Sequence, residues 1–168
     1  MSENSDQQAE SSAHQKRPAK AGLLRRLAAL LYDAFLVLAI WMVIGYAIQY
    51  VLGTDTNQII DGKPTTSSFA DALYFLMEVA TASTFYIWFW RRTGQTLGMI
   101  AWRIKATSAD GSIMTLKQAI LRFVLAWPSF WCFGLGYLWM YVDTNKDALH
   151  DKYSGTQVIV LPKNARPF

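Results

Sequence analysis

Apolar residues along this chain gather in three long blocks that polar segments separate. The blocks run over Leu27–Leu52, Phe69–Trp90 and Ala119–Val142, and each is about 22 to 26 residues long. An α-helix rises about 1.5 Å per residue, so about 20 apolar residues cross a hydrocarbon core roughly 30 Å thick. Each block is therefore long enough to cross a membrane as a helix. The pattern therefore predicts an all-α membrane protein in which the three blocks form a small helical bundle.

Aromatic residues near the ends of the blocks fit the same environment. A ring with a polar edge prefers the boundary between water and lipid. The residues of this kind are Tyr46, Tyr50, Tyr86, Trp88, Trp90, Trp139 and Tyr141. The alternative is the buried core of a soluble protein. However, apolar residues make up 52% of only 168 residues, which leaves too little polar surface to cover three long apolar helices.

The third block allows two interpretations, because Pro128 interrupts it and Arg122 lies near its start. In the first, it is one spanning helix with a proline kink, and the carboxyl terminus lies outside. In the second, it breaks at Pro128 into an interfacial or re-entrant helix and a second helix over about 130–142, and the carboxyl terminus returns inside. We favour the broken form, because Arg122 is easier to place at an interface than at membrane depth. The β-branched segment Thr156–Leu161 is expected to be extended.

Basic residues predict the orientation in the membrane. They precede the first block and recur through the 91–118 segment, whereas the 53–68 loop has Lys63 against Asp55 and Asp61. Such residues gather on the cytoplasmic side of membrane proteins, so the amino terminus and the 91–118 segment are expected inside. The net charge of +4 thus indicates topology and contact with anionic lipids rather than nucleic acid. The predicted location is a cell membrane, specifically the cytoplasmic membrane of a bacterium.

The two ends of the chain lie outside the predicted membrane domain. Residues 1–20 have few large apolar side chains and many Ser, Gln, Glu and Lys, so they are predicted to form a disordered cytoplasmic tail. The membrane domain is placed at 21–162, and 163–168 form a second short tail. The single Cys132 lies within the third block, which excludes an intrachain disulfide.

Three short motifs resemble the RDD family of membrane proteins, which is named after one arginine and two aspartates. The segment GLLRRLAALLYD over 22–33 looks like the opening of that family. GQTLG over 94–98 is similar to its central segment, and LHDKYSGT over 149–156 is similar to its closing segment. The resemblance covers about 22–161, in the order of the family.

The resemblance implies roles for particular residues. It places the arginine on Arg26, beside Arg25, and the two aspartates on Asp33 and Asp151. Met99 stands where the family often has Lys or Arg, so a basic contact is expected to be missing there. Some members look like participants in ion or solute transport, and others are membrane modules attached to different domains.

Arg26 and Asp33 lie seven residues apart, so a helix places them within about 20° of one face and roughly 10 Å apart along its axis. An aspartate at membrane depth costs about 2.5 to 3.5 kcal/mol, so it needs a partner. In one interpretation Asp33 faces the bundle interior, pairs with Arg26 or with Arg122 of another helix, and belongs to a polar pathway. In the other, it forms a structural pair near the cytoplasmic interface.

Two other polar positions are candidates. Glu78 is the most interior acid of the second block, where it either lines a polar track or bonds a neighbouring helix. Asp151 follows His150, but two adjacent side chains are a poor metal site, so no metal is predicted. We expect Asp151 in a solvated turn or in a lid over the cytoplasmic ends of the helices.

Glycines at 94 and 98 have the spacing of a helix-packing motif, but they fall in a polar segment, where a turn and an interfacial helix resting on the membrane are expected. The sequence contains no phosphate loop, dinucleotide fingerprint, nucleophile elbow or zinc motif, so neither an enzyme nor a cofactor is predicted.

Two functions remain after these exclusions. The first is transport of a small ion or solute that uses Arg26, Asp33 and Asp151, with Glu78 as an addition. So few helices would need a homo-oligomer or a membrane protein partner to enclose a path. The second is a membrane module that does not transport and that binds a protein partner or a lipid.

Overall fold

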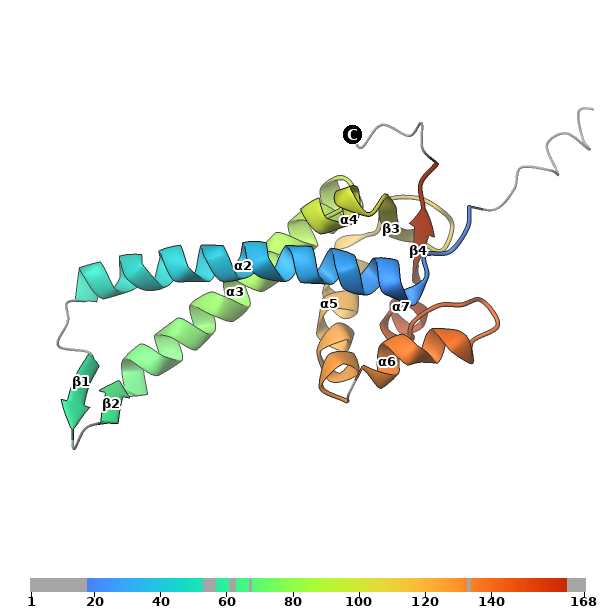
Figure 1. The fold of residues 1–168 in the computed structure, drawn as a ribbon. Coiled ribbons are helices and arrows are strands. Elements are labelled where there is room, and N and C mark those ends of the chain that lie inside the picture. Colours follow the sequence, from blue (N-terminus) through green and yellow to red (C-terminus); the bar gives the residue numbers. More distant parts are fainter. Residues whose placement is uncertain (1–17, 53–56, 61–62, 67, 133, 163–168) are drawn as a thin grey trace, which may run out of the picture.

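The structure is a computed structural model that describes residues 18–52, 57–60, 63–66, 68–132 and 134–162. Two long helices extend from a compact region of short helices and strands (Figure 1). These helices are α2, over Leu23–Leu52, and α3, over Ser68–Arg92. Together they account for the first two apolar blocks, whose helical state is confirmed.

Both long helices present apolar side chains outward. Among the described residues, α2 over Leu23–Val51 and α3 over Ser68–Arg92 are long and apolar enough to cross a membrane. Large apolar residues such as Phe35, Val43 and Phe75 are exposed on them. Contiguous apolar surface of this extent is costly in water, so these faces are suited to lipid.

A short hairpin separates the two long helices. Its strands are β1, over Asn57–Ile60, and β2, over Lys63–Thr66, and they pair antiparallel. The hairpin lies beyond the far end of α2 and α3, away from the compact region (Figure 1). The described chain is mostly helical, but it is not all-α as predicted, because it also contains strands.

The third apolar block differs in detail from both of the structures that the sequence predicts for it. Helix α5, over Leu116–Trp131, continues through Pro128. The chain then reverses near Gly134, whose φ of +73° suits a residue without a side chain. Helix α6 over Leu135–Leu138 and the 3-10 turn η2 over Trp139–Tyr141 follow. The block is therefore broken, but the predicted break at Pro128 and the predicted helix over 130–142 are wrong.

The compact region contains the core of the described chain. Strand β3, over Ile104–Ser108, pairs antiparallel with β4, over Thr156–Val160, which confirms the extended segment predicted near the carboxyl end. Helix α4, over Leu97–Ala101, precedes β3, and α7, over Leu149–Ser154, precedes β4. Apolar side chains of this region are almost fully buried: Ala21, Ile104, Ala106, Met114, Ala119 and Val158.

The segment just before α2 adds to the edge of this sheet. Lys20 forms an antiparallel bridge with Ile159, and the amide of Ala21 donates to the carbonyl of Val158 at 2.9 Å. Lys20 Nζ also binds Asp147 at 2.6 Å. Residues 18–20 thus belong to the folded region rather than to the predicted tail. Residues 1–17 and 163–168, where the rest of the predicted tails fall, lie outside the described residues.

Candidate functional site

Asp151 lies between two arginines that come from different helices. Its Oδ2 accepts a hydrogen bond from Arg26 of α2, and its Oδ1 accepts one from Arg122 of α5. All three side chains are buried, and Asp151 has no exposed surface. The prediction of a solvated turn for Asp151 is therefore wrong. Three segments far apart in the sequence meet at this carboxylate, and we call these three residues the Arg-Asp-Arg cluster.

The charge of Asp151 depends on its two arginines. Burial by itself would raise the pKa of this carboxyl, but the guanidinium groups of Arg122 and Arg26 outweigh it and hold the pKa well below its usual range. Asp151 is thus ionised at neutral pH. Removing either partner from a buried pair leaves an uncompensated charge, which costs about 3 to 5 kcal/mol.

Further contacts fix the orientation of both guanidinium groups. Arg26 Nε donates to the carbonyl of Ala21 at 2.9 Å, and Arg122 Nη1 donates to Thr156 Oγ1 at 2.8 Å. The Arg122 guanidinium also lies 4.9 Å from the centre of the Trp90 ring, in a cation–π contact. Arg122 is thereby held by α3, α7 and β4, which accounts for a cation in an apolar block.

His150 borders the same cluster without carrying a charge of its own. Its Nε2 lies 3.4 Å from Asp151 Oδ1, and its ring packs at 4.7 Å against Tyr137. Burial and the two nearby arginines outweigh the attraction of Asp151 and lower the pKa of His150 to about 4. The ring is therefore neutral at pH 7. Within the described residues, no group of three or more His, Cys, Asp or Glu side chains is placed to hold a metal ion.

Asp33 has a different set of partners. Its Oδ2 accepts a hydrogen bond from Thr96 Oγ1 at 2.5 Å, and its Oδ1 accepts one from the amide of Gly98 at 2.8 Å. Thr96 is the N-cap residue of α4 and Gly98 belongs to its first turn, so the carboxylate lies at the amino-terminal end of this short helix. The proposed pairing of Asp33 with Arg26 or Arg122 is not found, because both arginines bind Asp151 instead.

Gly98 permits the close approach of α4 to α2. A Cβ at this position would overlap the carbonyl oxygen of Ala29 and lie 3.0 Å from Asp33 Cγ. Gly94, in contrast, adopts a φ of +76° in the turn after α3. The turn predicted for this segment is confirmed, but Gly98 and Met99 are buried against protein, so this part of α4 does not rest on a membrane.

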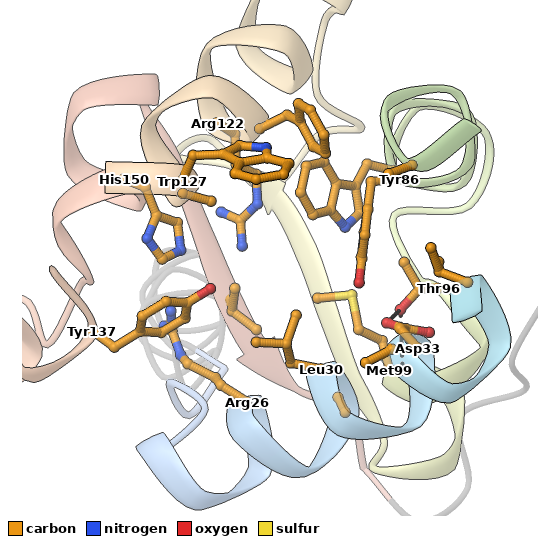
Figure 2. Close-up of a pocket in the computed structure, with 18 of the residues that line it drawn as sticks. Arg26, Leu30, Asp33, Tyr86, Thr96, Met99, Arg122, Trp127, Tyr137 and His150 are labelled. Carbon is orange, nitrogen blue, oxygen red and sulfur yellow. Dashed lines mark hydrogen bonds between the residues drawn. The ribbon is translucent and has the colours of Figure 1, made fainter. Parts of the chain in front are cut away.

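A cavity of about 600 Å³ opens between α2, α3 and α5. Arg26, Arg122 and His150 lie at one side of it, and Asp33 with Thr96 lies at the opposite side (Figure 2). The remaining walls are mostly apolar. They include Val37, Leu38 and Trp41 of α2, Ala82 of α3 and Phe123 of α5.

Glu78 does not join these groups. Its side chain is exposed on α3, and its backbone carbonyl accepts a hydrogen bond from Trp41 Nε1 at 3.2 Å. The structure thus brings together Arg26, Arg122 and Asp151, places Asp33 across the cavity, and leaves Glu78 apart. Thr96 and Gly98 are site residues that the sequence interpretation missed. Both belong to the GQTLG motif, but no spacing rule connects this motif to Asp33, which lies 63 positions earlier than Thr96.

Comparison with known proteins agrees with the motifs that meet at this site. Over 88 residues, the chain is 33% identical to an uncharacterised protein of Rickettsia prowazekii. That match covers 52% of this chain and 49% of the relative, so the chain matches about half the length of that relative. No solved structure matches the chain. The sequence profile of the RDD family matches residues 20–155, which include the Arg-Asp-Arg cluster and Asp33. The chain belongs to the RDD family.

Proposed function

We propose that this protein is a multi-pass protein of a cell membrane, with the amino terminus and the 91–118 segment inside. The exposed apolar faces of α2 and α3 support this placement. The basic residues of the chain support the orientation, because Arg25, Arg91 and Arg92 lie at the ends of α2 and α3 that meet the compact region.

The carboxyl end belongs on the same side in this proposal. Strand β4 pairs with β3 of the 91–118 segment, and its residue Ile159 pairs with Lys20 ahead of α2. A strand cannot form these bonds across a membrane. Of the two interpretations of the third block, this pairing favours the one that returns the chain to the inside.

The function that the geometry supports best is binding of a lipid or another small amphiphile within the membrane. One observation carries this proposal: the cavity of about 600 Å³ has apolar walls and a few convergent polar groups. Sites for small molecules have this size and composition. The cavity lies between the two candidate membrane spans and α5, so a ligand can reach it from lipid.

Filling the cavity tests this function. Ala82 lines the cavity on α3, whereas Ala80 of the same helix is exposed. We expect the purified wild-type protein to retain one molecule of added dioleoyl phosphatidylcholine in native mass spectrometry. Ala82→Phe should lose it, because the ring occupies the space, and Ala80→Phe should keep it. Equal retention by both variants contradicts binding in the cavity.

Transport of a small ion or solute is the second candidate. It is favoured by the carboxylate of Asp33, which borders the cavity from within α2 (Figure 2). Sealed vesicles with a pH or sodium gradient should then show flux through the wild-type protein that Asp33→Asn abolishes while the protein still folds. Flux that does not exceed that of empty vesicles across several ions excludes this candidate and leaves the binding function.

A further inference from the structure

Both arginines at the cavity have donor atoms that the described residues do not use. Arg26 Nη2 and Arg122 Nε are buried and have no hydrogen-bond partner within the described part of the chain. Each side chain is more than nine-tenths buried, with exposed fractions of 4% for Arg26 and 5% for Arg122. A buried donor without a partner costs about 1 to 3 kcal/mol, and more when it is charged. Two such donors at one end of a cavity point to an acceptor that a ligand supplies.

The charges at this end of the cavity do not balance. Arg26 and Arg122 carry two positive charges, and Asp151 compensates one of them. His150 is neutral at pH 7, as its lowered pKa of about 4 requires. Asp33 lies at the other side of the cavity and uses both carboxylate oxygens on α4 (Figure 2). The arginine end therefore retains one positive charge, and a complementary ligand carries a negative one.

The cavity is long enough for a lipid tail. On α2 its lining runs from Arg26 to Trp41, which is roughly 22 Å at 1.5 Å per residue. Half of a hydrocarbon core is about 15 Å thick. The charged end lies toward the compact region, where head groups of that leaflet would be, and the far end is lined by Val37, Leu38 and Trp41.

We propose, on the basis of the binding function above, that the cavity takes an acidic phospholipid from the leaflet on the side of the compact region. Its phosphate pairs with the guanidinium groups of Arg26 and Arg122, and an acyl chain lies along the apolar walls of α2 and α3. Guanidinium groups are well suited to this contact, because their planar set of donors matches phosphate oxygens. A free phosphate would satisfy the same donors but would leave the apolar walls uncovered.

Competition between defined lipids tests the proposal on the full-length protein. Native mass spectrometry would measure binding of dioleoyl phosphatidylglycerol, dioleoyl phosphatidylcholine and glycerol phosphate at equal concentrations. Both lipids carry the phosphate, but the choline cation of the zwitterionic lipid is repelled by the uncompensated arginine charge. We therefore expect the acidic lipid to bind about 10-fold more tightly, which is about 1.4 kcal/mol. Glycerol phosphate alone should bind far more weakly than either lipid.

Neighbouring arginines provide a matched pair of variants. Arg26→Gln removes the cation at the cavity, and Arg25→Gln removes an exposed cation one residue earlier on α2. The preference for the acidic lipid should disappear in the first and persist in the second. If Arg26→Gln does not fold, Arg26→Lys keeps a cation for Asp151 but lacks the planar fork of donors that matches a phosphate, so it should weaken binding of the acidic lipid several-fold.

The outcomes separate this inference from the function on which it rests. Equal binding of both lipids by the wild-type protein, lost in Ala82→Phe, overturns the acidic specificity and leaves the cavity as a lipid site. Tight binding of glycerol phosphate alone overturns the lipid as the source of the anion. A preference that Arg25→Gln abolishes as fully as Arg26→Gln assigns it to the basic surface and overturns the proposed site. Lipid binding that Ala82→Phe does not alter removes both the inference and the binding function.

Discussion

Asp151 is the acid that two buried cations share, so its replacement tests the Arg-Asp-Arg cluster directly. Asp151→Asn removes the charge and leaves Arg26 and Arg122 buried without a carboxylate. We expect a loss of about 3 to 5 kcal/mol in the free energy of unfolding, measured by thermal unfolding in detergent. Asp110→Asn, at an exposed turn where the carboxylate binds Ser112, is the control and should lower the melting temperature far less. Similar melting of both variants argues against a structural role for the cluster.

His150 makes stability depend on pH. Its unfolded-state pKa of about 6.5 falls to about 4 in the folded protein, so between these values the unfolded chain binds a proton that the folded chain does not. Stability should therefore fall as the pH is lowered from about 6.5 to about 4, by at most about 1.4 kcal/mol per pH unit.

The matching variant isolates this effect from other titrations. His150→Phe keeps a ring against Tyr137 and cannot titrate, so it should flatten the dependence in that window. Asp151 contributes no slope there, because its pKa is lowered from 3.8 and its stabilisation is lost only at still lower pH. Unfolding curves of both proteins across the pH series provide the measurement. An unchanged slope in the variant would contradict a buried neutral histidine.

The sequence alone predicts which side chains belong to the site better than it predicts which of them form pairs. The motifs locate Arg26, Asp33 and Asp151, and Arg122 stands out as a cation near the start of the third apolar block that could pair with Asp33. The ion pairs of the cluster cannot be predicted from the sequence, because helical spacing relates residues only within one helix. Asp151 lies 125 positions after Arg26 and 29 after Arg122, and only the tertiary fold brings them together.

At the scale of elements, the contact between α2 and α4 depends on the absence of a side chain at Gly98. Gly98→Ala introduces a Cβ that overlaps the Ala29 carbonyl, so α4 must move and the hydrogen bonds to Asp33 must lengthen. We expect a loss of about 1 to 3 kcal/mol in stability. Gly45→Ala, in α2 with open space around it, is the control and should melt at or above the temperature of the wild type, because alanine favours a helix more than glycine does. Thermal unfolding of both variants in detergent measures the difference, and equal melting temperatures would contradict the close contact at Gly98.

Length was a reliable guide to α2 and α3, because few soluble structures need so many consecutive apolar residues. It was a poor guide to the third block. Proline costs a helix one hydrogen bond and does not have to end it, whereas the reversal needed the positive φ of Gly134. Strand β3 was missed because its partner β4 lies about 50 residues later, and five residues alone give a weak pattern.

At the scale of the whole molecule, the sheet fixes both ends of the described chain on one side of α2 and α3. A reporter fused after the final residue should therefore be read on the same side as one fused to the amino terminus. Green fluorescent protein should fluoresce at both ends, and alkaline phosphatase should be inactive at both. Alkaline phosphatase inserted into the 53–68 loop should be active. Opposite results at the two ends exclude the proposed topology.

Because the chain is synthesised from its amino terminus, the Arg-Asp-Arg cluster cannot form until α7 has been synthesised. Arg26 and Arg122 leave the ribosome before Asp151, which belongs to α7. Until α7 folds back, both cations remain without their counterion and favour a hydrated position over a sealed one. A polypeptide terminated ahead of α7 would keep this state permanently, with two bare guanidinium groups beside lipid. Docking of α7 therefore supplies the counterion that allows both guanidinium groups to be buried.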